Sequence, residues 1–309
     1  MISIVVVNWN SGHLLKNCVA SLLANAYNCE LVIVDNASDD FSLEAAARLS
    51  TDLSILKNDR NLGFAAAANQ GWRASRGSHI LFLNPDVVCL PGSVECLEKT
   101  LAADESVWAV AGHLVDPSGR PQRYFNVRSF PSTAGVAAEM LFLTGLRSLL
   151  SLDRFLAKKA PAHALDVDQP AAACLMIKRA ALETTGGFDE SFLPAWYEDV
   201  DLCRRIRDRG GRIQYQPAAR FIHHGGYSLG RLSRESFLVT FNRNRIRYFH
   251  KHHGPKTAAR IRLLITVGLW LRSTLSLLYP LIPGESRRSA AKIFRNAERS
   301  VRKQREVRL

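Results

Sequence analysis

The chain has 309 residues, of which 47% are hydrophobic and 22% are charged, a composition typical of a folded globular protein and not of a disordered one. Its formal net charge of +13 is concentrated at one end, because residues 231–309 carry 19 Lys and Arg against 4 Asp and Glu. Such a basic segment indicates an anionic partner. The six cysteines form no C-x-x-C pair and no zinc-site spacing, which favours reduced structural thiols in the cytosol.

The first 115 residues alternate between apolar, β-branched segments and segments whose apolar residues recur at helical spacing. We expect strands at 3–8, 30–35, 53–58, 79–84 and 107–111. Between them we expect helices near 11–25, 41–49, 63–75 and 92–102. Strands that are apolar throughout are typical of a parallel sheet buried on both faces. The expected fold class is therefore α/β, with a mostly parallel, Rossmann-like sheet covered by helices on both faces.

Polar residues follow three of these strands at the point where each strand ends. The three pairs are Asn8 and Asn10, Asp35 and Asn36, and Asn84 and Asp86. Asn and Asp are common turn formers, so a single pair carries little weight. Three pairs in one sheet indicate a ligand site, because open α/β sheets bind ligands beyond the carboxyl ends of their strands.

The middle of the chain is less regular. Residues 116–122 form a turn-rich segment, and 138–156 are expected to form a surface helix or a helix pair. The glycine-rich loop 185–192 is expected to close over a substrate. The regular elements expected here are strands at 171–179, 212–217 and 219–224 and a helix at 198–209.

Residues 231–309 are expected to form a second domain, a basic and partly amphipathic helical extension of a domain at 1–230. The apolar segment 263–283 is long enough to raise the question of a membrane span, but Arg272 interrupts it. A narrow polar stripe comprises Arg262, Thr266, Ser273 and Ser276. We favour a helix that lies in a membrane interface, with a span and a helix packed on the protein as alternatives. The basic helix 287–308 is suited to anionic headgroups.

Six motifs, taken together and in order, resemble those of the family-two glycosyltransferases, and most of all the rhamnosyltransferase-like members of bacterial surface-polysaccharide synthesis. The motifs are SIVVVNWNSG, LVIVDNASDD, NLGFAAAANQG, LFLNPDV, GGFDESFLPAWYEDVDLCRRIRDRGGRI and HHGGYS. The resemblance covers residues 2–230 and implies the GT-A fold, which binds nucleotide sugars. It also implies transfer of a sugar from a nucleotide diphosphate to an acceptor hydroxyl, with inversion at the anomeric carbon.

A divalent cation, Mg²⁺ or Mn²⁺, is the expected cofactor, because it stabilises the charge of a leaving diphosphate and prefers oxygen ligands. The resemblance places Asp86 at the Asp-x-Asp position of the family, where Asn84 replaces the first acid. His223 fits the His-x-x-Gly-x-Ser spacing of the family, and either His223 or His224 is expected to reach the metal or the diphosphate.

The resemblance assigns the nucleobase of the donor to Asp35, whose carboxylate can accept the imide N–H of uracil or thymine. The other residues expected at the donor site are Val7, Asn8, Asn10, Asn36, Gly63, Phe64, Asn69 and Asn84. No G-x-G-x-x-G occurs in the sequence, so a dinucleotide-binding fold is disfavoured.

An acidic cluster of Glu198, Asp199 and Asp201 begins the helix expected at 198–209. Inverting transfer needs one base for the acceptor proton, and the resemblance assigns it to Asp199. Glu198 is expected to orient the acceptor or the loop, and Asp201 to pair with a nearby arginine. Acids at a helix start are also favoured by the helix dipole, which is the alternative reading of this cluster.

We therefore expect a metal-dependent hexosyltransferase, with L-rhamnose from dTDP-rhamnose as the favoured donor. A UDP-sugar enzyme for N-acetylglucosamine, galactose or galactofuranose is the main alternative, and a nucleic-acid-binding protein is the alternative of a different class. Expected partners are the donor, a glycan or lipid-linked acceptor, an anionic membrane surface and a second copy of the chain as a homodimer; nucleic acid is disfavoured. The expected location is cytoplasmic, on the inner face of the membrane.

Overall fold

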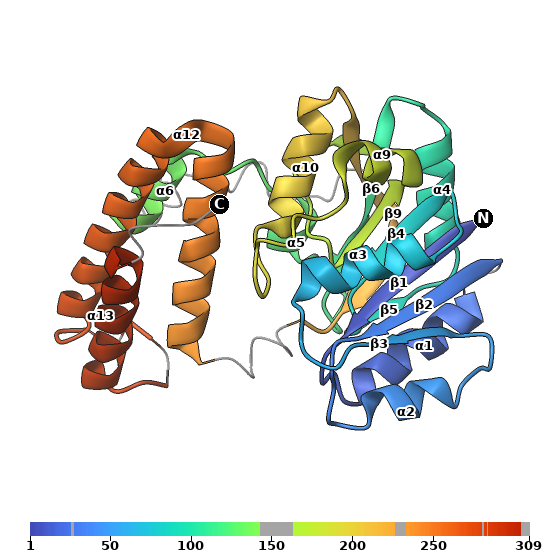
Figure 1. Ribbon diagram of the computed structural model, residues 1–309, viewed down its shortest axis with the longest axis horizontal. Helices are drawn as coiled ribbons and strands as arrows, with labels where there is room; N and C mark the ends of the chain where they lie inside the picture. The colour runs from blue at the N-terminus through green and yellow to red at the C-terminus, as the bar shows by residue number, and fades with distance from the viewer. Residues whose placement is uncertain (26–27, 143–162, 226–232, 280, 283, 304–309) are drawn as a thin grey trace. The chain divides into compact units, whose positions relative to one another are not determined.

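The computed structural model describes residues 1–25, 28–142, 163–225, 233–279, 281–282 and 284–303 (Figure 1). The chain divides into two compact units. The first, here called the sheet unit, comprises residues 1–130 and 160–230, and the second, the helical unit, comprises residues 131–159 and 231–309.

The sheet unit is built on one sheet with strand order β3-β2-β1-β4-β8-β6-β9-β5. Four strands form its parallel part, β1 (Ile2–Asn8), β2 (Cys29–Asp35), β3 (Ser54–Lys57) and β4 (His79–Leu83). Next comes β8 (Cys174–Lys178), antiparallel to both β4 and β6 (Val107–Val115). The parallel sheet expected from the sequence is therefore present in the N-terminal half, whereas the whole sheet is mixed.

The far half of the sheet centres on β9 (Arg212–His223), which runs parallel to β6. Two strands of the expected pattern, 212–217 and 219–224, are in fact this one strand, whose register against β6 shifts between Gly112 and His113. Two short strands pair with it antiparallel, β5 (Val87–Cys89) and β7 (Leu165–Asp166).

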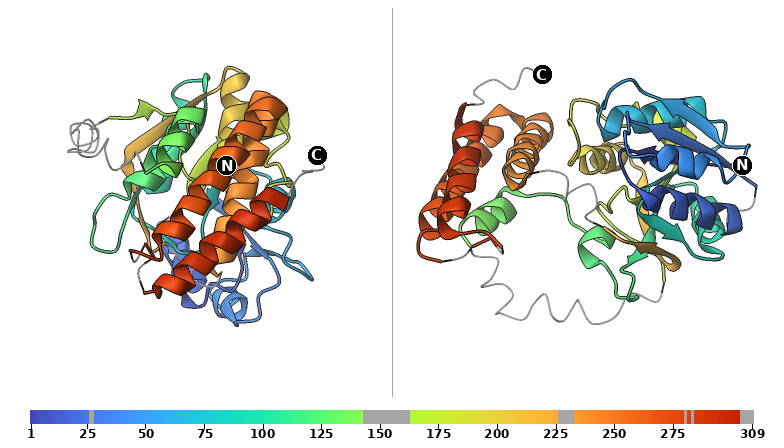
Figure 2. Two further views of the ribbon diagram at one scale, coloured as in Figure 1. Left: turned by 90° about the vertical axis from the view of Figure 1, so that its left-hand side faces the viewer. Right: turned by 90° about the horizontal axis from the view of Figure 1, so that it is seen from below.

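Helices cover both faces of the sheet, as expected (Figures 1 and 2). Buried side chains of α1 (His13–Asn25), α2 (Ser42–Ala47) and α4 (Ser93–Ala102) share one hydrophobic cluster with the sheet. Side chains of α3 (Phe64–Ala74), α9 (Arg179–Thr185) and α10 (Glu198–Asp208) share the other. Alternate residues of β1 point into the two clusters, Ile4 and Val6 into the first and Val5 and Val7 into the second.

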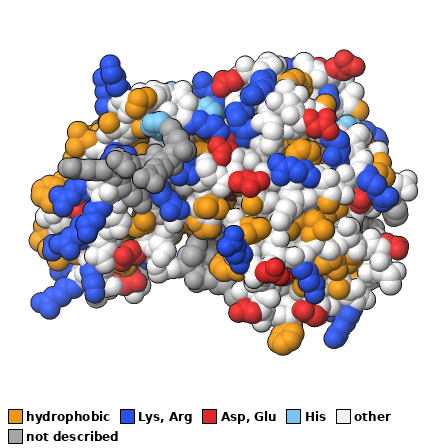
Figure 3. Space-filling model, viewed as in Figure 1, with side chains coloured by type: hydrophobic (Ala, Val, Ile, Leu, Met, Phe, Trp, Pro, Cys, Tyr) orange, Lys and Arg blue, Asp and Glu red, His pale blue; other side chains and the backbone are white. Residues whose placement is uncertain are grey.

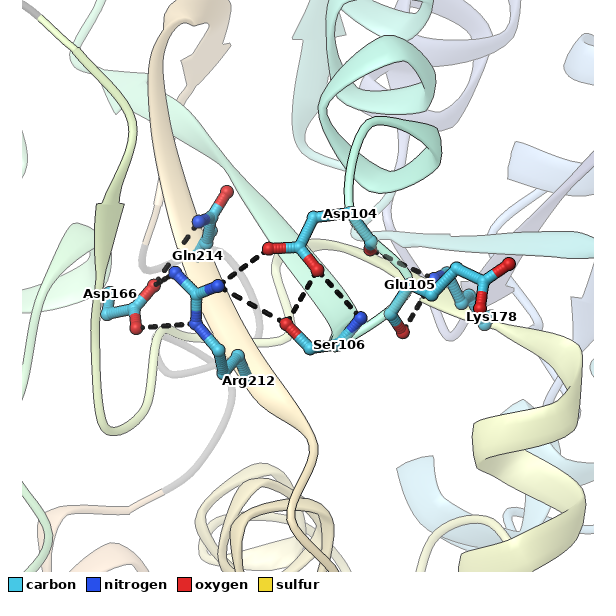
Figure 4. Close-up of polar contacts among 7 residues, drawn as sticks. All are labelled: Asp104, Glu105, Ser106, Asp166, Lys178, Arg212 and Gln214. Carbon is cyan, nitrogen blue, oxygen red and sulfur yellow. Dashed lines mark hydrogen bonds and ion pairs between the residues drawn. The ribbon is translucent and has the colours of Figure 1, made fainter.

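A surface network fixes β7 to the edge of the sheet (Figure 4). The Arg212 guanidinium donates to both carboxylate oxygens of Asp166, at 2.8 and 2.9 Å, and to Asp104 at 2.7 Å. Gln214 donates to Asp166 as well, at 3.2 Å. These hydrogen bonds lower the pKa of the Asp166 carboxyl. The network holds a sequence-distant segment against β9, and none of its members is a predicted site residue.

The cysteines are distributed as structural residues. Cys18, Cys89, Cys174 and Cys203 are buried, and Cys29 and Cys96 are half-buried. Burial raises the pKa of the Cys29 thiol to about 11 and that of Cys89 to about 12. Thiols held protonated in this way are poor nucleophiles and metal ligands.

In its described residues the helical unit contains α6 (Thr133–Met140), α12 (Arg234–Leu275) and α13 (Arg287–Lys303). The dihedral angles of Gly254 (φ 80°) break the helical path of α12 ahead of Pro255, so the long helix is kinked there. In place of the helix expected at 138–156, α6 begins earlier, at Thr133, and ends at Met140; residues 143–156 of the expected range lie outside the described residues.

The division expected at residue 230 omits α6, which packs with the C-terminal helices. Arg272 of α12 donates to the backbone oxygens of Met140, at 2.8 Å, and Glu139, at 2.6 Å. Arg245 forms an ion pair with the Glu139 carboxylate at 2.9 Å. A guanidinium at these last carbonyls satisfies groups that a helix end leaves unpaired, which explains why α6 belongs to the helical unit.

The narrow polar stripe expected in this segment lies on α12, with Arg262 and Thr266 half-buried. Ser273 and Ser276 are buried, and Ser273 Oγ donates to the backbone oxygen of Ala291 in α13 at 2.9 Å. Leu263 and Trp270 are instead 64% and 58% exposed. Of the described helices, none combines the length and apolarity needed to cross a bilayer.

Candidate functional site

The ends of β1 and β2 meet as the sequence predicts, because Asn8 and Asp35 are neighbours in the parallel register. The Asn8 amide nitrogen lies 2.7 Å from Asp35 Oδ1, 2.9 Å from Ser42 Oγ and 3.0 Å from Ser38 Oγ. The other Asp35 oxygen accepts from the Ser38 backbone N–H at 3.1 Å. Asp35 and Asn8 thus shape the turn after β2, and Asp35 is largely buried behind it.

Asn10 completes this turn from the β1 side. It has a left-handed backbone (φ 50°), which Asn tolerates better than most residues. Its Oδ1 accepts from the Asp39 N–H at 2.7 Å, and its own N–H donates to Ser38 Oγ at 2.9 Å. Val7, also expected at the donor site, is a buried strand residue whose side chain packs in the core.

Asn36 organises the next loop. Its Oδ1 accepts from the Leu62 N–H at 2.9 Å, and its Nδ2 donates to Asn61 Oδ1 at 2.9 Å and to the Gly63 backbone oxygen at 3.2 Å. The side chain is buried, so its hydrogen bonds serve the 58–63 loop. This is the loop-shaping role that Asp and Asn after a strand often have.

The start of α3 is fastened to the segment that precedes α10. The Phe64 N–H donates to the Pro194 backbone oxygen at 2.8 Å. A Cβ on Gly63 (φ 84°) would lie 2.9 Å from that oxygen and 2.9 Å from a Leu193 methyl carbon, so only glycine fits there. The Phe64 ring packs edge-on against Phe188, with centroids 5.5 Å apart.

Asn69 is engaged by the protein itself. Its Nδ2 donates to the Phe188 backbone oxygen and to Glu190 Oε1, both at 2.8 Å, and its Oδ1 accepts from Phe188 N–H at 2.9 Å and Trp72 Nε1 at 3.0 Å. Its amide is therefore occupied by the 186–190 loop, and it is 1% exposed. The glycine-rich loop that the sequence suggests as a lid is held to α3 at these points.

Asp86, just before β5, and His223, at the end of β9, lie close together. The Asp86 carboxylate Oδ1 is 3.5 Å from His223 Nε2. Asp86 Oδ1 is buried and has no hydrogen-bond partner among the described residues. The neighbouring predicted residue Asn84 is half-buried. His224 is exposed, and its backbone N–H, not its ring, contacts Asp86, through the backbone oxygen at 3.0 Å.

Gln122 sets the tautomer of His223. Gln122 Nε2 donates to the His223 backbone oxygen at 2.7 Å, which orients the amide so that its Oε1 faces His223 Nδ1 at 2.6 Å. An amide oxygen can only accept, so Nδ1 carries the proton. In the neutral ring, Nε2 then presents its lone pair toward Asp86. Burial lowers the pKa of the His223 imidazole, although the Asp86 carboxylate raises it.

This pair fits a divalent cation. Two lone-pair donors face each other without a proton between them, and one of them is an orphaned buried carboxylate oxygen. A carboxylate oxygen and an imidazole nitrogen are both competent ligands for Mn²⁺ or Mg²⁺. Within the described residues no group of three or more His, Cys, Asp and Glu gathers around a common point. Of the three predicted metal ligands the structure thus unites Asp86 and His223, and not His224.

The acidic cluster begins α10, after two residues with left-handed backbones, Trp196 (φ 72°) and Tyr197 (φ 76°). Such a conformation is costly for aromatic residues and is maintained where the surrounding structure enforces it. Asp199 Oδ2 accepts from Arg128 Nη2 at 2.7 Å, and its Oδ1 accepts from the Val200 N–H at 2.8 Å. The Asp199 side chain is partly exposed, at 14%.

The surroundings of Glu198 differ from those of Asp199. It is buried, and its Oε2 has no hydrogen-bond partner among the described residues. Burial, and then the charge of Asp199, raise the pKa of the Glu198 carboxyl well above its ordinary value. Asp199 is thus the member of the pair that is held by a cation, whereas the surroundings of Glu198 favour its protonated form.

Asp201 has the structural role that was expected. It is 0% exposed, and its Oδ2 lies 2.7 Å from Arg205 Nη2. Arg205 also donates to the Thr185 backbone oxygen at 2.7 Å, which ties α10 to the end of α9. Arg204 pairs instead with Asp208, at 2.8 Å.

The residues that sequence reasoning missed are Gln122 and Arg128, which flank the short helix α5 (Arg123–Asn126) after β6. Gln122 orients His223, and Arg128 holds Asp199. One short stretch thereby contacts both halves of the site. The only signal in the sequence is a run of polar residues after a strand end, which also describes an ordinary surface turn.

A hollow of about 920 Å³ lies elsewhere on the sheet unit, along α4 and β9. Its lining includes Glu95, Cys96, Lys99 and Gln216, and none of the predicted site residues. It therefore adds nothing to the site built from Asp86 and Asp199.

Comparison with known proteins gives consistent results. The sequence model described as glycosyl transferase family 2 matches residues 3–153. The chain is 26% identical over 295 residues to an N-acetylglucosaminyl-diphospho-decaprenol L-rhamnosyltransferase of Mycobacterium tuberculosis, covering 89% of this chain and 92% of the relative. It is 22% identical over 230 residues to the rhamnosyltransferase WbbL of Escherichia coli, covering 72% and 83%.

Solved structures agree on the fold. A mannosyltransferase of Pyrobaculum calidifontis, PcManGT, determined with GDP-Man and Mn²⁺, superposes with a TM-score of 0.57 over 99% of this chain and 88% of that one, at 15% identity. A GalNAc-T7 structure with UDP, GalNAc and Mn²⁺ gives a TM-score of 0.55 at 14% identity, over 82% of this chain and 51% of that one. At these identities the likeness concerns the fold, and it confirms the GT-A architecture.

Proposed function

The chain belongs to glycosyltransferase family 2, and we propose that it is an inverting, cation-dependent enzyme that transfers a deoxyhexose to a lipid-linked glycan. The observation that carries the proposal is the double role of segment 122–128. Gln122 prepares the His223–Asp86 pair, and Arg128 holds Asp199. Segment 122–128 thereby positions both groups that such a transfer requires, a site for the diphosphate and a base for the acceptor.

Asp86 and His223 are the residues that would hold the cation, Mg²⁺ or Mn²⁺. The bound cation would supply stabilisation of the charge on the leaving diphosphate. Gln122 keeps His223 Nδ1 protonated and leaves Nε2 free to bind, a second-layer contact of the kind that fixes metal-binding histidines. Asn84, in place of an acid, leaves the group at this strand end with one carboxylate fewer.

Asp199 is the proposed base that accepts the proton of the attacking hydroxyl. Glu198 is less suited to this role because its carboxyl group is buried and its raised pKa favours the protonated form, which cannot accept a proton. In that form it could donate a hydrogen bond to the acceptor or to the loop. A buried carboxyl group beside a more exposed, cation-paired one is the kind of asymmetry that divides acid and base roles in enzymes. With Asp199 as the base and no carboxylate acting as a nucleophile, a single displacement with inversion is the expected course.

The turn after β2 is the proposed nucleobase site. Asp35 and Asn8 are bonded to each other, and Asn10, Asn36 and Gly63 hold the backbone around them. Because the carboxyl ends of β1 and β2 adjoin here, a base could lie against this edge. Asn69 supports the proposed site indirectly, through its hydrogen bond to the 186–190 loop.

The choice of rhamnose rests on the relatives. The match to the mycobacterial rhamnosyltransferase covers 89% of the chain, so it extends beyond residue 230 into the helical unit. That relative is named for an acceptor that carries a diphospho-polyprenol, which favours a lipid-linked acceptor here. A UDP-sugar donor is the second candidate, because the GalNAc-T7 structure of the same fold contains UDP. An acceptor of this kind would place the enzyme at the inner face of the membrane.

A donor panel tests the proposal. The purified full-length chain is incubated with a synthetic N-acetylglucosaminyl-diphospho-polyprenol and with dTDP-rhamnose, UDP-N-acetylglucosamine, UDP-galactofuranose or GDP-mannose, in Mn²⁺, in Mg²⁺ and in EDTA. We expect transfer from dTDP-rhamnose with either metal and none in EDTA. Transfer from a UDP-sugar alone would replace the rhamnose donor, and transfer that persists in EDTA would overturn the cation at Asp86 and His223. Light scattering of the same sample gives its oligomeric state, and a nucleic-acid gel shift tests the alternative class.

A further inference from the structure

One face of α12 stays exposed along its second half. Seven positions share it, with alternating spacings of four and three residues, and all seven are exposed: Lys256, Arg260, Leu263, Val267, Trp270, Thr274 and Leu277, the last just beyond the helix end. This spacing places them in one line along a helix. The opposite face is buried in the helical unit through Ile261, Ile265 and Leu269.

The character of this face is unusual for protein in contact with water. Leu263 and Trp270 are 64% and 58% exposed, while Ser273 and Ser276 on the inner side are buried. Leu278 and Tyr279, after the helix, are exposed as well, at 62% and 64%. A row of exposed large apolar residues marks a surface that another body covers.

Basic residues adjoin the apolar row. Lys256 and Arg260 extend it at one end, and three arginines of α13, Arg295, Arg299 and Arg302, share a hollow of about 260 Å³ with Trp270. Each of the three arginines is exposed, and the one acid in the hollow, Glu298, lies 3.7 Å from Arg302. Residues 256–303 contain eleven Lys and Arg against two Glu. Figure 3 shows Lys and Arg side chains beside hydrophobic ones on the face of the helical unit that is in view.

We infer that this face of α12, together with the arginine hollow of α13, docks on an anionic lipid bilayer. The row from Leu263 to Leu277 enters the headgroup region, Trp270 lies at the level of the headgroups, and Arg295, Arg299 and Arg302 bind lipid phosphates. Trp is suited to this level because its ring is apolar and its N–H is polar. Guanidinium groups bind phosphate oxygens in a forked geometry. The inference does not rest on the proposed transfer chemistry.

A second copy of the chain is the competing occupant, because four–three spacing also occurs in paired helices. The charge of this face disfavours a second copy. A parallel pairing would bring together the Lys256 and Arg260 ends of two copies, and an antiparallel one would bring this end toward the arginine hollow of the other copy. In both arrangements like charges oppose the contact. An anionic bilayer is complementary to the same residues over the whole face.

Vesicle sedimentation of the full-length chain tests the inference, without any sugar substrate. The probes are vesicles of phosphatidylcholine and vesicles of phosphatidylcholine with phosphatidylglycerol. We expect binding to the second kind only, and weaker binding as salt is raised. In the triple variant Arg295→Gln, Arg299→Gln, Arg302→Gln, binding should weaken by about tenfold or more. The matched control, Lys16→Gln, Arg48→Gln, Arg207→Gln, removes the same charge from exposed positions of the sheet unit and should bind as the wild type does.

The apolar row is tested separately. Trp270→Ser should weaken vesicle binding by several-fold to about tenfold, whereas Phe41→Ser, at a 79% exposed position of the sheet unit, should not. Equal losses in the arginine variant and its charge control would overturn the inference, as would wild-type binding by Trp270→Ser. Sedimentation equilibrium covers the competing occupant. A wild-type dimer that Trp270→Ser converts to a monomer, with vesicle binding unchanged, would assign the face to a second copy. Failure of vesicle binding leaves the donor-panel result intact, so the two proposals fail separately.

Discussion

Both units of the chain bury polar side chains, but the hydrogen bonding of these side chains differs. In the sheet unit, Asp86 Oδ1 and Glu198 Oε2 are buried with no hydrogen-bond partner among the described residues. In the helical unit, Arg272 and Ser273 point inward as well, yet Arg272 is bonded to two carbonyls of α6 and Ser273 to one of α13. A buried polar group left unpaired costs stability, so such a group needs an explanation. Within the described part of the chain, unpaired buried atoms also occur away from the proposed site, Asn242 Oδ1 of α12 among them. What distinguishes Asp86 and Glu198 is therefore that each lies beside a second titratable group, His223 or Asp199.

The largest effect should come from the base. Asp199→Asn should lower kcat by about 100- to 10,000-fold, because general-base catalysis contributes that much, while the dissociation constant of the donor stays within about twofold. Steady-state transfer and donor titration calorimetry measure the two quantities. The control is Asp208→Asn, which removes an exposed ion pair from the same helix and should leave kcat unchanged. A kcat near that of the wild type in Asp199→Asn would place the base elsewhere.

The cation site should be sensitive to a residue that never touches the cation. Gln122→Ala frees His223 to rotate and to change tautomer, and it should weaken Mn²⁺ binding by about 10- to 100-fold. Calorimetry of Mn²⁺ binding in the presence of nucleoside diphosphate measures this. Gln216→Ala, which removes a hydrogen bond to Thr100 away from the site, is the matched control. Equal Mn²⁺ affinities in the two variants would show that Gln122 does not position the ligand.

Arg272→Leu should lower stability, whereas the two preceding variants are expected to change catalysis or cation binding. It leaves the Met140 and Glu139 carbonyls without their donor, which should cost about 2 kcal/mol in the free energy of unfolding of the helical unit. Denaturant unfolding followed by circular dichroism gives the change, and Arg260→Leu, at an exposed position of the same helix, should cost little. If Arg272→Leu unfolds like the wild type, the distinction between paired and unpaired groups does not hold in this unit.

Glu198 should make stability fall as pH rises. Its pKa is raised in the folded chain, so the folded state keeps a proton that the unfolded state releases above its ordinary pKa of about 4.3. The stabilisation is complete below that value and declines above it, by up to about 1.4 kcal/mol per pH unit, until the raised pKa is reached. Glu198→Gln should flatten the curve above the ordinary pKa of Glu and keep more activity than Glu198→Ala. A wild-type curve no steeper than that of Glu198→Gln would contradict a protonated Glu198.

The smallest effect should be the energetic coupling between Arg128 and Asp199. Arg128→Gln should lower kcat in the wild type and have almost no effect in Asp199→Asn, because the two residues act as one unit. We expect an interaction energy on the order of 1 kcal/mol in the double-mutant cycle on kcat. Additive effects would mean that Arg128 serves the fold and not Asp199.

The sequence predicted the regular part of the sheet unit well, because its strands are apolar runs and its helices have apolar residues at helical spacing. The strands from β1 to β4 and the polar residues at their ends lie where they were expected. The short strands β5 and β7 were not predicted, because their partners on β9 are distant in the sequence and decide their conformation.

The site was predictable only as far as its motifs reach. Asp86, His223, Glu198 and Asp199 follow from resemblance, whereas Gln122 and Arg128 act through contacts that no spacing encodes. The environments of Glu198 and Asp199 could not be predicted either, since one position along a helix start separates a buried carboxyl from a paired one. On α12 the sequence indicated the pattern of polar and apolar residues but not which side faces the protein, because arginine and serine are equally suited to water and to the carbonyls of a neighbouring helix.

The configuration of the product tests the central claim most directly. The claim is that Asp199 acts as the base at the bond that forms and that no carboxylate acts as a nucleophile, so that the sugar is transferred in one displacement. The coupling constants of the anomeric proton in the purified product, measured by nuclear magnetic resonance and compared with those of the donor, report the outcome. Inversion at the anomeric carbon is the predicted result. A retained configuration would contradict the account, because it requires a second displacement that this arrangement of carboxyl groups does not provide.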